Sequence, residues 1–573
     1  PLKRLHNLKT QAAANLLTKQ PRAAPRQNDN LNHEIAGKWG TKRRSVEAEM
    51  LWAGGRLQAG CRRKDGIRLE VFMRWLLAML IGGFVAPIAM IFAAPQFAQP
   101  AHAAQRRPNI VMILTDDLGI NDLGCYGRKD HRTPHLDKLA SEGMRFTSPY
   151  CAQPICSPSR AAILTGLTPA RLHLTTYLPG RPDTRAQKLL HPIIRQELPL
   201  ERRTLAEILA RAGYATACIG KWHLGGTGFS PAEQGFGVVF AGRANTTPSA
   251  TEGGKGEYEL TSRAMQFVDE NRARPFFLYL AHNNPHIPLA AKTELIEKNR
   301  DAFNPVYAAV IETLDDSVGR LLARLDELGL RDDTIVVFTS DNGGLHVPEA
   351  REDPPTHNTP YRAGKGFLYE GGLRVPLIIR WPGHIRGGEV SMVPVINTDF
   401  MPTLLELVRV ESPLNLDGLS FAEVLLTGKP PAQRTFFWHF PHYNNQGGRP
   451  AGAIRDGDWK LIEYYDSHGV ELFNLSRDPG EKKDLSALGG ARAKAMREQL
   501  ATWRKEIGAQ ENRPNPDCDP ELYRRLYIDT DVSRLEPAAK AAAMTPKLAA
   551  WRAGMDSVLP KPPPTLPPHP KPR

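Results

Sequence analysis

Cysteine is scarce in this chain, which has six in 573 residues. Six cysteines are too few for the dense disulfide framework of small secreted domains, and none of their spacings matches a zinc site. Cys61 would be lost with the leader predicted below, so we expect at most two disulfides. The sequence does not determine which cysteines pair. Cys218 lies within an apolar strand pattern, where a purely structural role is expected.

The chain also lacks a large charge excess outside its first 74 residues. Residues 1–74 contain 16 lysines and arginines against 6 acidic residues, so most of the formal net charge of +13 lies there. The rest of the chain is close to balanced, and the composition therefore gives no support for a nucleic-acid partner.

Residues 1–72 lack sustained helical or strand periodicity and mix Gln, Asn, Lys and Arg. We interpret this stretch as disordered or as upstream sequence outside the mature protein.

One long apolar run, residues 75–92, follows Met73 and Arg74 and leads to Ala101-His102-Ala103. A basic start, an apolar run and an A-x-A site are typical of a signal peptide, predicted here over residues 73–103. A transmembrane helix is the alternative, since the run nearly reaches the roughly 20 residues that a span needs. Glycines and a proline inside the run favour the export signal. We therefore expect an exported protein, periplasmic or extracellular, with no stable membrane span after cleavage.

The length exceeds what one hydrophobic core serves, so more than one domain is expected. Over residues 104–430, apolar strands alternate with helical segments at 135–142, 204–212 and 309–328, which predicts an α/β domain with a mostly parallel central sheet flanked by helices. Residues 431–510 predict a smaller antiparallel α+β subdomain, with short strands between 435 and 473 and a helix over 491–507. Residues 511–573 form a C-terminal extension with a Pro-rich tail.

Two of the buried-strand patterns end in pairs of residues whose side chains carry oxygen ligands. The run 109–114 precedes Asp116 and Asp117, and the run 334–338 precedes Asp341 and Asn342. The carboxyl ends of parallel strands meet at one edge of a sheet, and a divalent cation such as Ca²⁺ would relieve the repulsion between these groups. The alternative is that each pair caps the next helix or forms an Asx turn.

Several short motifs carry a family resemblance. They are Cys156-Ser157-Pro158-Ser159-Arg160, Gly220-Lys221-Trp222-His223-Leu224-Gly225, Pro285-His286-Ile287-Pro288, Gly364-Lys365-Gly366 and Glu370-Gly371-Gly372-Leu373-Arg374-Val375-Pro376. In this order they resemble the motifs of the type I, formylglycine-dependent sulfatases of the arylsulfatase kind. The resemblance implies an alkaline phosphatase-like fold and hydrolysis of a sulfate ester.

In that family a maturation enzyme oxidises the motif cysteine to Cα-formylglycine, whose hydrate attacks sulfur. The resemblance implies this modification for Cys156, with a formylglycine-generating enzyme as a partner. The alternative is a small buried cysteine beside a turn.

The resemblance also implies a role for each motif residue. Asp116, Asp117, Asp341 and Asn342 would bind Ca²⁺, close to the modified Cys156. Arg160 and Lys221 would hold the hydrated aldehyde, His223 would accept a proton as sulfate leaves, Lys365 would bind sulfate oxygens, and His286 would serve the leaving oxygen. We choose His286 over His282 because the motif places its histidine directly before x-Pro. His282 remains a substrate-side candidate.

The expected substrate is a sulfated small molecule or saccharide, with a carbohydrate sulfate favoured and aryl sulfates accepted. Aromatic and imidazole groups at 438–443 suggest further substrate contacts by His439, His442 and Arg449, although such strand ends are also typical of a core. Two alternatives stay open: a phosphonate or phosphate monoester hydrolase of the same superfamily, and a non-catalytic carbohydrate-binding relative.

Overall fold

The computed structural model describes residues 107–559. The upstream stretch, the predicted signal peptide and the tail at 560–573 lie outside the described residues. Within residues 107–559, no helix combines the length and the apolar character needed to cross a bilayer.

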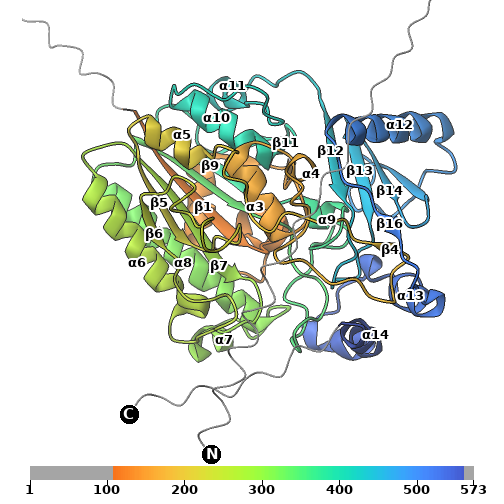
Figure 1. The fold of residues 1–573 in the computed structure, drawn as a ribbon. Coiled ribbons are helices and arrows are strands. Elements are labelled where there is room, and N and C mark those ends of the chain that lie inside the picture. Colours follow the sequence, from red (N-terminus) through yellow and green to blue (C-terminus); the bar gives the residue numbers. More distant parts are fainter. Residues whose placement is uncertain (1–106, 560–573) are drawn as a thin grey trace, which may run out of the picture. The chain divides into compact units, whose positions relative to one another are not determined.

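A large sheet forms the centre of the described chain (Figure 1). Its strand order is β10-β2-β9-β8-β1-β7-β5-β6. Its strands are β1 (Asn109–Asp116), β2 (Met144–Phe146), β5 (Ala215–Gly220), β6 (Val238–Phe240), β7 (Phe276–Pro285), β8 (Thr334–Ser340), β9 (Leu377–Arg380) and β10 (Glu389–Ser391). Strand β9 is antiparallel to β8 and β2, and the other neighbouring pairs are parallel. The predicted mostly parallel α/β sheet is confirmed.

Helices cover both faces of this sheet, as Figure 1 shows. They are α2 (Pro134–Glu142), α3 (Cys156–Thr165), α5 (Leu205–Arg211), α6 (Gly253–Asn271), α8 (Pro305–Glu327) and α10 (Phe400–Leu407). Alternate residues of β1 enter two separate cores: Ile110 packs with α3, α5 and α10, and Val111 packs with α2, α6 and α8. Because both faces of β1 are covered, its sequence is apolar without a break.

The predicted helices begin and end within a few residues of the observed ones. The largest difference is α8, which starts at Pro305 rather than at 309. Asn304 caps its first turn by accepting hydrogen bonds from the backbone amides of Val306 and Tyr307, and proline suits the first helical position.

The functional edge of the sheet depends on register. Strand β1 lies between β7 and β8, so the carboxyl ends of all three strands reach the same edge. The pairing of β1 with β7 shifts between Leu114 and Asp116, where Asp116 pairs with Pro285. This irregularity brings the residue after β7, His286, close to the end of β1.

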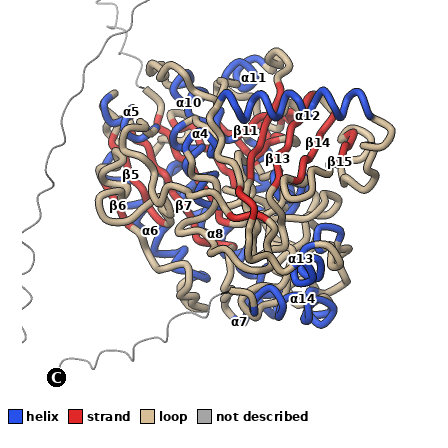
Figure 2. Tube along the Cα trace, turned by 45° about the vertical axis from the view of Figure 1, so that its right-hand side comes forward, coloured by secondary structure: helices blue, strands red, loops and turns tan. Residues whose placement is uncertain are grey.

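A second, antiparallel sheet follows in the order β12-β13-β14-β15. Its strands are β12 (Thr435–Phe440), β13 (Ala451–Asp456), β14 (Trp459–Tyr464) and β15 (Val470–Asn474). The Asp-Gly turn expected between β13 and β14 contains Gly457, which has φ 58°. Helix α12 (Gly490–Glu506) packs across these strands (Figure 2), as predicted.

The C-terminal extension is more ordered than its composition suggests. Helices α13 (Pro520–Tyr527) and α14 (Thr545–Ser557) pack onto the body of the protein, and Trp551 and Met555 are buried in a shared core. The remaining elements are η1 (Ile120–Asp122), η2 (Gly124–Tyr126), β3 (Pro149–Tyr150), α4 (Pro169–Leu172), β4 (Leu189–Leu190), α7 (Thr293–Lys298), α9 (Glu370–Leu373), β11 (Val395–Ile396), η3 (Asn397–Asp399), α11 (Ala422–Thr427), β16 (Arg513–Pro514), η4 (Val532–Arg534) and η5 (Ala541–Ala543).

The five cysteines within residues 107–559 are free thiols in this structure. Cys218 is buried in the core under α5, in agreement with the structural role expected for it.

Candidate active site

The site begins at the end of β1. Asp116 is the last residue of the strand, and Asp117 follows with φ 67°, a conformation that residues other than glycine seldom adopt. The backbone amide of Asp117 donates to Asp341 Oδ1 at 3.1 Å, which ties the ends of β1 and β8 together. Strained backbone of this kind is often found at functional sites.

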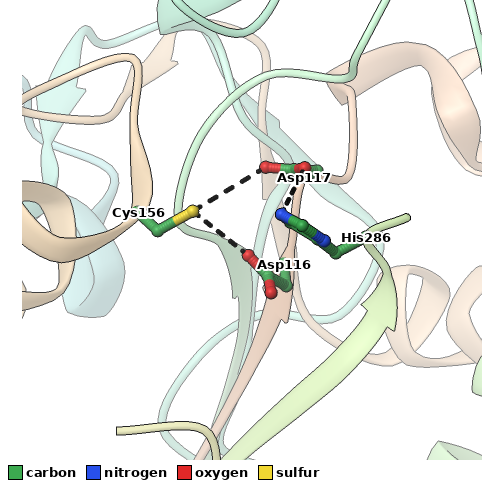
Figure 3. A group of neighbouring side chains, drawn as sticks. All are labelled: Asp116, Asp117, Cys156 and His286. Atoms are coloured by element: carbon green, nitrogen blue, oxygen red, sulfur yellow. Dashed lines mark hydrogen bonds and ion pairs between the residues drawn. The ribbon is translucent and has the colours of Figure 1, made fainter. Parts of the chain in front are cut away.

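Cys156 is the first residue of α3, a helix whose residues are all buried. Its Sγ lies 3.4 Å from Asp116 Oδ1 and 4.0 Å from Asp117 Oδ1 (Figure 3). Burial raises the pKa of the Cys156 thiol well above its ordinary value. An unmodified Cys156 is therefore a neutral thiol, which is a weak nucleophile.

Asp116, Asp117, Cys156 and His286 each place one donor atom within 4.8 Å of the other three. Figure 3 shows the His286 ring facing the Asp117 carboxylate, and His286 Nε2 lies 3.6 Å from Asp117 Oδ2. Asn342 joins this group, because its Nδ2 donates to Asp117 Oδ1 at 2.7 Å. Its Oδ1 is buried without a hydrogen-bond partner.

These donors fit a hard divalent cation. Burial raises the pKa of Asp341 to about 7, with a further contribution from Asp116, although Arg160 opposes the shift. Burial therefore makes negative charge at the end of β8 unfavourable even with Arg160 beside it. The unpartnered Asn342 oxygen and the neighbouring carboxylates form an oxygen-rich set of the type that suits Ca²⁺.

Three cations surround the carboxylates. Lys221 Nζ lies 2.6 Å from Asp116 Oδ2, Lys365 Nζ lies 2.7 Å from Asp117 Oδ2, and Arg160 contacts Asp341 at 2.8 Å. Burial opposes ionisation of Asp116, but Lys221 and the other nearby cationic groups outweigh it and hold the pKa well below its ordinary value. Buried charges of both signs are thus paired, as their desolvation requires.

Two imidazoles complete the group. His223 has φ 59°, and its Nε2 donates to the Leu178 carbonyl at 2.8 Å, which leaves Nδ1 buried without a partner. Burial, aided by Lys221, lowers the pKa of His223 to about 3. Burial and Lys365 lower the pKa of His286 to about 3 as well. Both rings are neutral at ordinary pH, and His223 keeps a free acceptor nitrogen.

A cavity of about 690 Å³ opens onto this group. Five of the sequence-predicted catalytic residues line it: Cys156, Lys221, His223, His286 and Lys365. Arg160, Asp116, Asp117 and Asp341 are buried and are not among the residues that line the cavity.

The structure does not bring the four predicted substrate-side residues to this cavity. His282 Nδ1 contacts Glu257, His442 Nε2 contacts the Thr175 hydroxyl at 2.8 Å, and Arg449 pairs with Asp466. His439 contacts the Tyr465 hydroxyl and the Gln510 carbonyl, each at 2.8 Å. In the described chain each of these four side chains therefore has a partner inside the protein rather than a place on the cavity wall.

Sequence reasoning missed a second layer behind His286. Lys255 Nζ contacts the carbonyl oxygens of His286 and, at 3.1 Å, Ile287. It also donates to Asn245 Oδ1 at 2.9 Å, and Asn245 Nδ2 donates to Asp116 Oδ2 at 3.1 Å. The available signal was Gly254 and Gly256 on either side of Lys255, which have φ 84° and 82° and kink the start of α6.

Comparison with known proteins identifies the family of this arrangement. The "Sulfatase" family model matches residues 108–410, and "N-sulphoglucosamine sulphohydrolase, C-terminal" matches residues 363–506. Human arylsulfatase A is 36% identical over 68% of this chain and 85% of its own sequence. N-acetylgalactosamine-6-sulfatase of Rattus norvegicus is 36% identical over 67% of this chain and 82% of its own sequence. The crystal structure of "Ps i-CgsB", also solved in complex with k-i-k-neocarrahexaose, is 29% identical with a TM-score of 0.62 over 74% of this chain and 98% of its own.

Proposed function

The chain belongs to the type I sulfatases of the alkaline phosphatase superfamily and hydrolyses sulfate esters, and we propose that it uses a formylglycine made from Cys156 and a bound calcium ion. The calcium ligands would be Asp116, Asp117, Asp341 and Asn342. The single observation that carries the proposal is the convergence of the Asp116, Asp117, Cys156 and His286 donor atoms within 4.8 Å.

When present, the hydrated formylglycine supplies an oxygen nucleophile and the cation supplies positive charge beside it. The residues around them would position and stabilise charge. Lys365 lines the cavity and would bind sulfate oxygens, while Lys221 and Arg160 would hold the nucleophile and stabilise charge that builds up during transfer.

The two histidines would handle protons on opposite sides of sulfur. His223 Nδ1 has no partner, so it can accept a proton when sulfate is released. His286 lines the cavity and would protonate the leaving oxygen. Its neutral ring must first gain a proton, which an anionic sulfate ester in the cavity would favour.

A carbohydrate sulfate is the proposed natural substrate, with aryl sulfates accepted. Part of the cavity wall is apolar and part carries amides and charged groups, which suits a sugar ring. The relatives that act on or bind sugars by name, N-acetylgalactosamine-6-sulfatase and the k-i-k-neocarrahexaose complex, support this choice.

Export and maturation are further parts of the proposal. Cys156 is 2% exposed in the folded chain. A formylglycine-generating enzyme would therefore have to act before the segment around Cys156 folds. This order of events agrees with export directed by the leader predicted at 73–103, during which the chain would still be unfolded.

The test is chemical analysis of Cys156 in active protein. After production with a maturation enzyme, the peptide containing Cys156 should lack a free thiol and react with a hydrazide probe, and the protein should contain calcium. Cys156→Ala should abolish turnover, and Asp341→Asn should lose the metal while remaining folded.

Active enzyme with an intact thiol would refute the mechanism. Faster hydrolysis of phosphonate or phosphate esters than of paired sulfate esters would favour the other superfamily reaction, and no turnover by matured protein would favour a binding protein.

A further inference from the structure

One carboxylate on the cavity wall is not used by the proposed chemistry. Glu349 lines the same cavity as Cys156 and Lys365 and lies on the loop between β8 and α9. It precedes a two-residue turn, closed by a hydrogen bond from the Glu352 amide to the Glu349 carbonyl at 2.9 Å. Ala350 and Arg351 in this turn have φ 52° and 67°. Such backbone conformations persist only where the surrounding structure holds them.

Two amides from the C-terminal half of the chain hold the Glu349 carboxylate. Asn445 Nδ2 donates to its Oε1 at 2.9 Å, and Gln446 Nε2 donates to its Oε2 at 2.6 Å. Arg552 of α14 supports Asn445 by donating to its backbone carbonyl at 2.7 Å and to its Oδ1 at 3.2 Å. Three segments far apart in sequence thus build one polar group on the cavity wall.

This polar group has unused capacity to accept hydrogen bonds. A carboxylate offers about four acceptor positions, and the two amides occupy two of them. Among the described residues, the amides of Asn445 and Gln446 are its hydrogen-bond partners, and Lys365 interacts with the Glu349 charge electrostatically from a greater distance. The Gln446 Oε1 atom is also buried without a partner. A ligand that donates hydrogen bonds would satisfy the group.

The rest of the cavity favours a ligand with an apolar face. Leu178, Trp222 and Val239 line it, and Val239 is 44% exposed on the edge strand β6. A pyranose ring combines an apolar C–H face with hydroxyl donors around its edge. Aryl groups have an apolar face but lack the hydroxyl donors around its edge.

We propose that Glu349, held by Asn445 and Gln446, is a specificity-determining group that binds hydroxyls of the sugar ring carrying the sulfate. This inference rests on the proposed sulfatase function and adds the substrate class to it. The negative charge of Glu349 also disfavours a second sulfate or a carboxylate on the same ring, because like charges at close range in a partly buried site repel. The preferred substrate is therefore a sugar ring that carries one sulfate and no other charged group.

The test compares Glu349→Gln with Glu352→Gln, a matched carboxylate at the other end of the same turn that accepts from the Leu289 amide outside the cavity. Matured enzymes are assayed with 4-nitrophenyl sulfate, a panel of monosulfated hexoses and their disulfated counterparts. For the best monosulfated hexose, Glu349→Gln should lower kcat/KM by about 10- to 100-fold, the usual effect of losing hydrogen bonds to a charged group. The loss on 4-nitrophenyl sulfate should be at least about ten times smaller. The ratio of disulfated to monosulfated activity should rise, while Glu352→Gln should keep the wild-type pattern.

Equal losses by Glu349→Gln on the aryl and sugar esters, no loss on the sugar ester, or an unchanged disulfated to monosulfated ratio would each overturn the inference. If Glu349→Gln does not fold, Glu349→Asp withdraws the charge by one methylene and must produce the same sugar-selective loss. A wild-type enzyme that hydrolyses no sulfate ester would instead contradict the proposed function, so the two failures are distinguishable.

Discussion

At the scale of single residues, the site depends on which nitrogen of each imidazole is free. His223 has Nε2 bound to the Leu178 carbonyl and Nδ1 unpartnered, so its ring can accept a proton without rearrangement. His286 has Nδ1 against the Ile287 carbonyl and Nε2 toward Asp117. These positions suit the two rings to the different tasks proposed for them, although their pKa values are shifted in the same direction.

His286→Ala should therefore impair hydrolysis in proportion to the basicity of the leaving oxygen. A nitrophenolate departs readily without a proton, whereas a sugar alkoxide does not, so kcat should fall about 100-fold or more on a sugar sulfate and much less on 4-nitrophenyl sulfate. Steady-state kinetics with nitrophenyl, phenyl and sugar sulfates measures this dependence. Equal losses on all three esters would contradict the assignment.

The same series separates His286 from Glu349. His286→Ala should lower kcat more on phenyl sulfate than on nitrophenyl sulfate, because the phenyl leaving group is the more basic of the two. Glu349→Gln should have the same small effect on both aryl esters, since neither ester carries sugar hydroxyls. His223→Ala provides the matched histidine control: it should release one equivalent of alcohol in a burst and then stall, whichever ester is used.

At the scale of secondary-structure elements, buried neutral histidines join the antiparallel sheet to the rest of the protein. His439, on β12, contacts the Gln510 carbonyl beyond α12, and His442, just after β12, contacts Thr175 in the α/β domain. Burial lowers the pKa of His439 to about 3 and that of His442 well below its ordinary value. These residues were predicted to contact substrate, but their packing indicates a structural role.

This packing predicts a pH-dependent stability. The unfolded chain binds a proton on the His439 imidazole below about pH 6.5, whereas the folded chain does not until about pH 3, so acid favours unfolding. The lowered pKa of His442 acts in the same direction. The free energy of unfolding should fall by up to about 1.4 kcal/mol per pH unit for each such histidine as pH drops below 6. Urea unfolding of wild type and His439→Gln between pH 7 and 4.5 measures the slopes. The same dependence of unfolding free energy on pH in both proteins would contradict the coupling between His439 protonation and unfolding.

At the scale of the whole molecule, the C-terminal half completes the catalytic cavity. Asn445 and Gln446 follow β12, yet they line the same cavity as Cys156 and Lys365. Helix α14 supports this loop through Arg552, although its sequence lies outside both matched family models. The cavity wall thus includes parts of the chain that the catalytic motifs do not contain.

The described residues contain all the contacts named for the site, so a chain beginning at Ala104 should be sufficient for activity. Produced with a maturation enzyme, it should fold and hydrolyse 4-nitrophenyl sulfate with kcat/KM within about two-fold of the longer protein. Circular dichroism and the aryl sulfate assay check this. If this chain is insoluble while the longer one folds, residues 1–103 belong to the folded unit and the predicted leader at 73–103 is wrong.

The sequence by itself determined the family and the main sheet. The Cys156-Ser157-Pro158-Ser159-Arg160 motif is local, and unbroken apolar runs such as 109–114 can only be strands or helices covered on both sides. Because parallel strands collect their carboxyl ends at one edge, even the convergence of Asp116, Asp117, Asp341 and Lys221 followed from the pattern.

Only the tertiary structure decided which side chains reach the cavity. His439 and Arg449 belong to an aromatic and basic segment that looks suited to binding sugars, yet register and packing direct them to Tyr465 and Asp466. Glu349, Asn445 and Gln446 carry no local motif and meet through loops nearly a hundred residues apart. The direction of a side chain depends on what packs against its segment from elsewhere in the chain, and no local pattern contains that information.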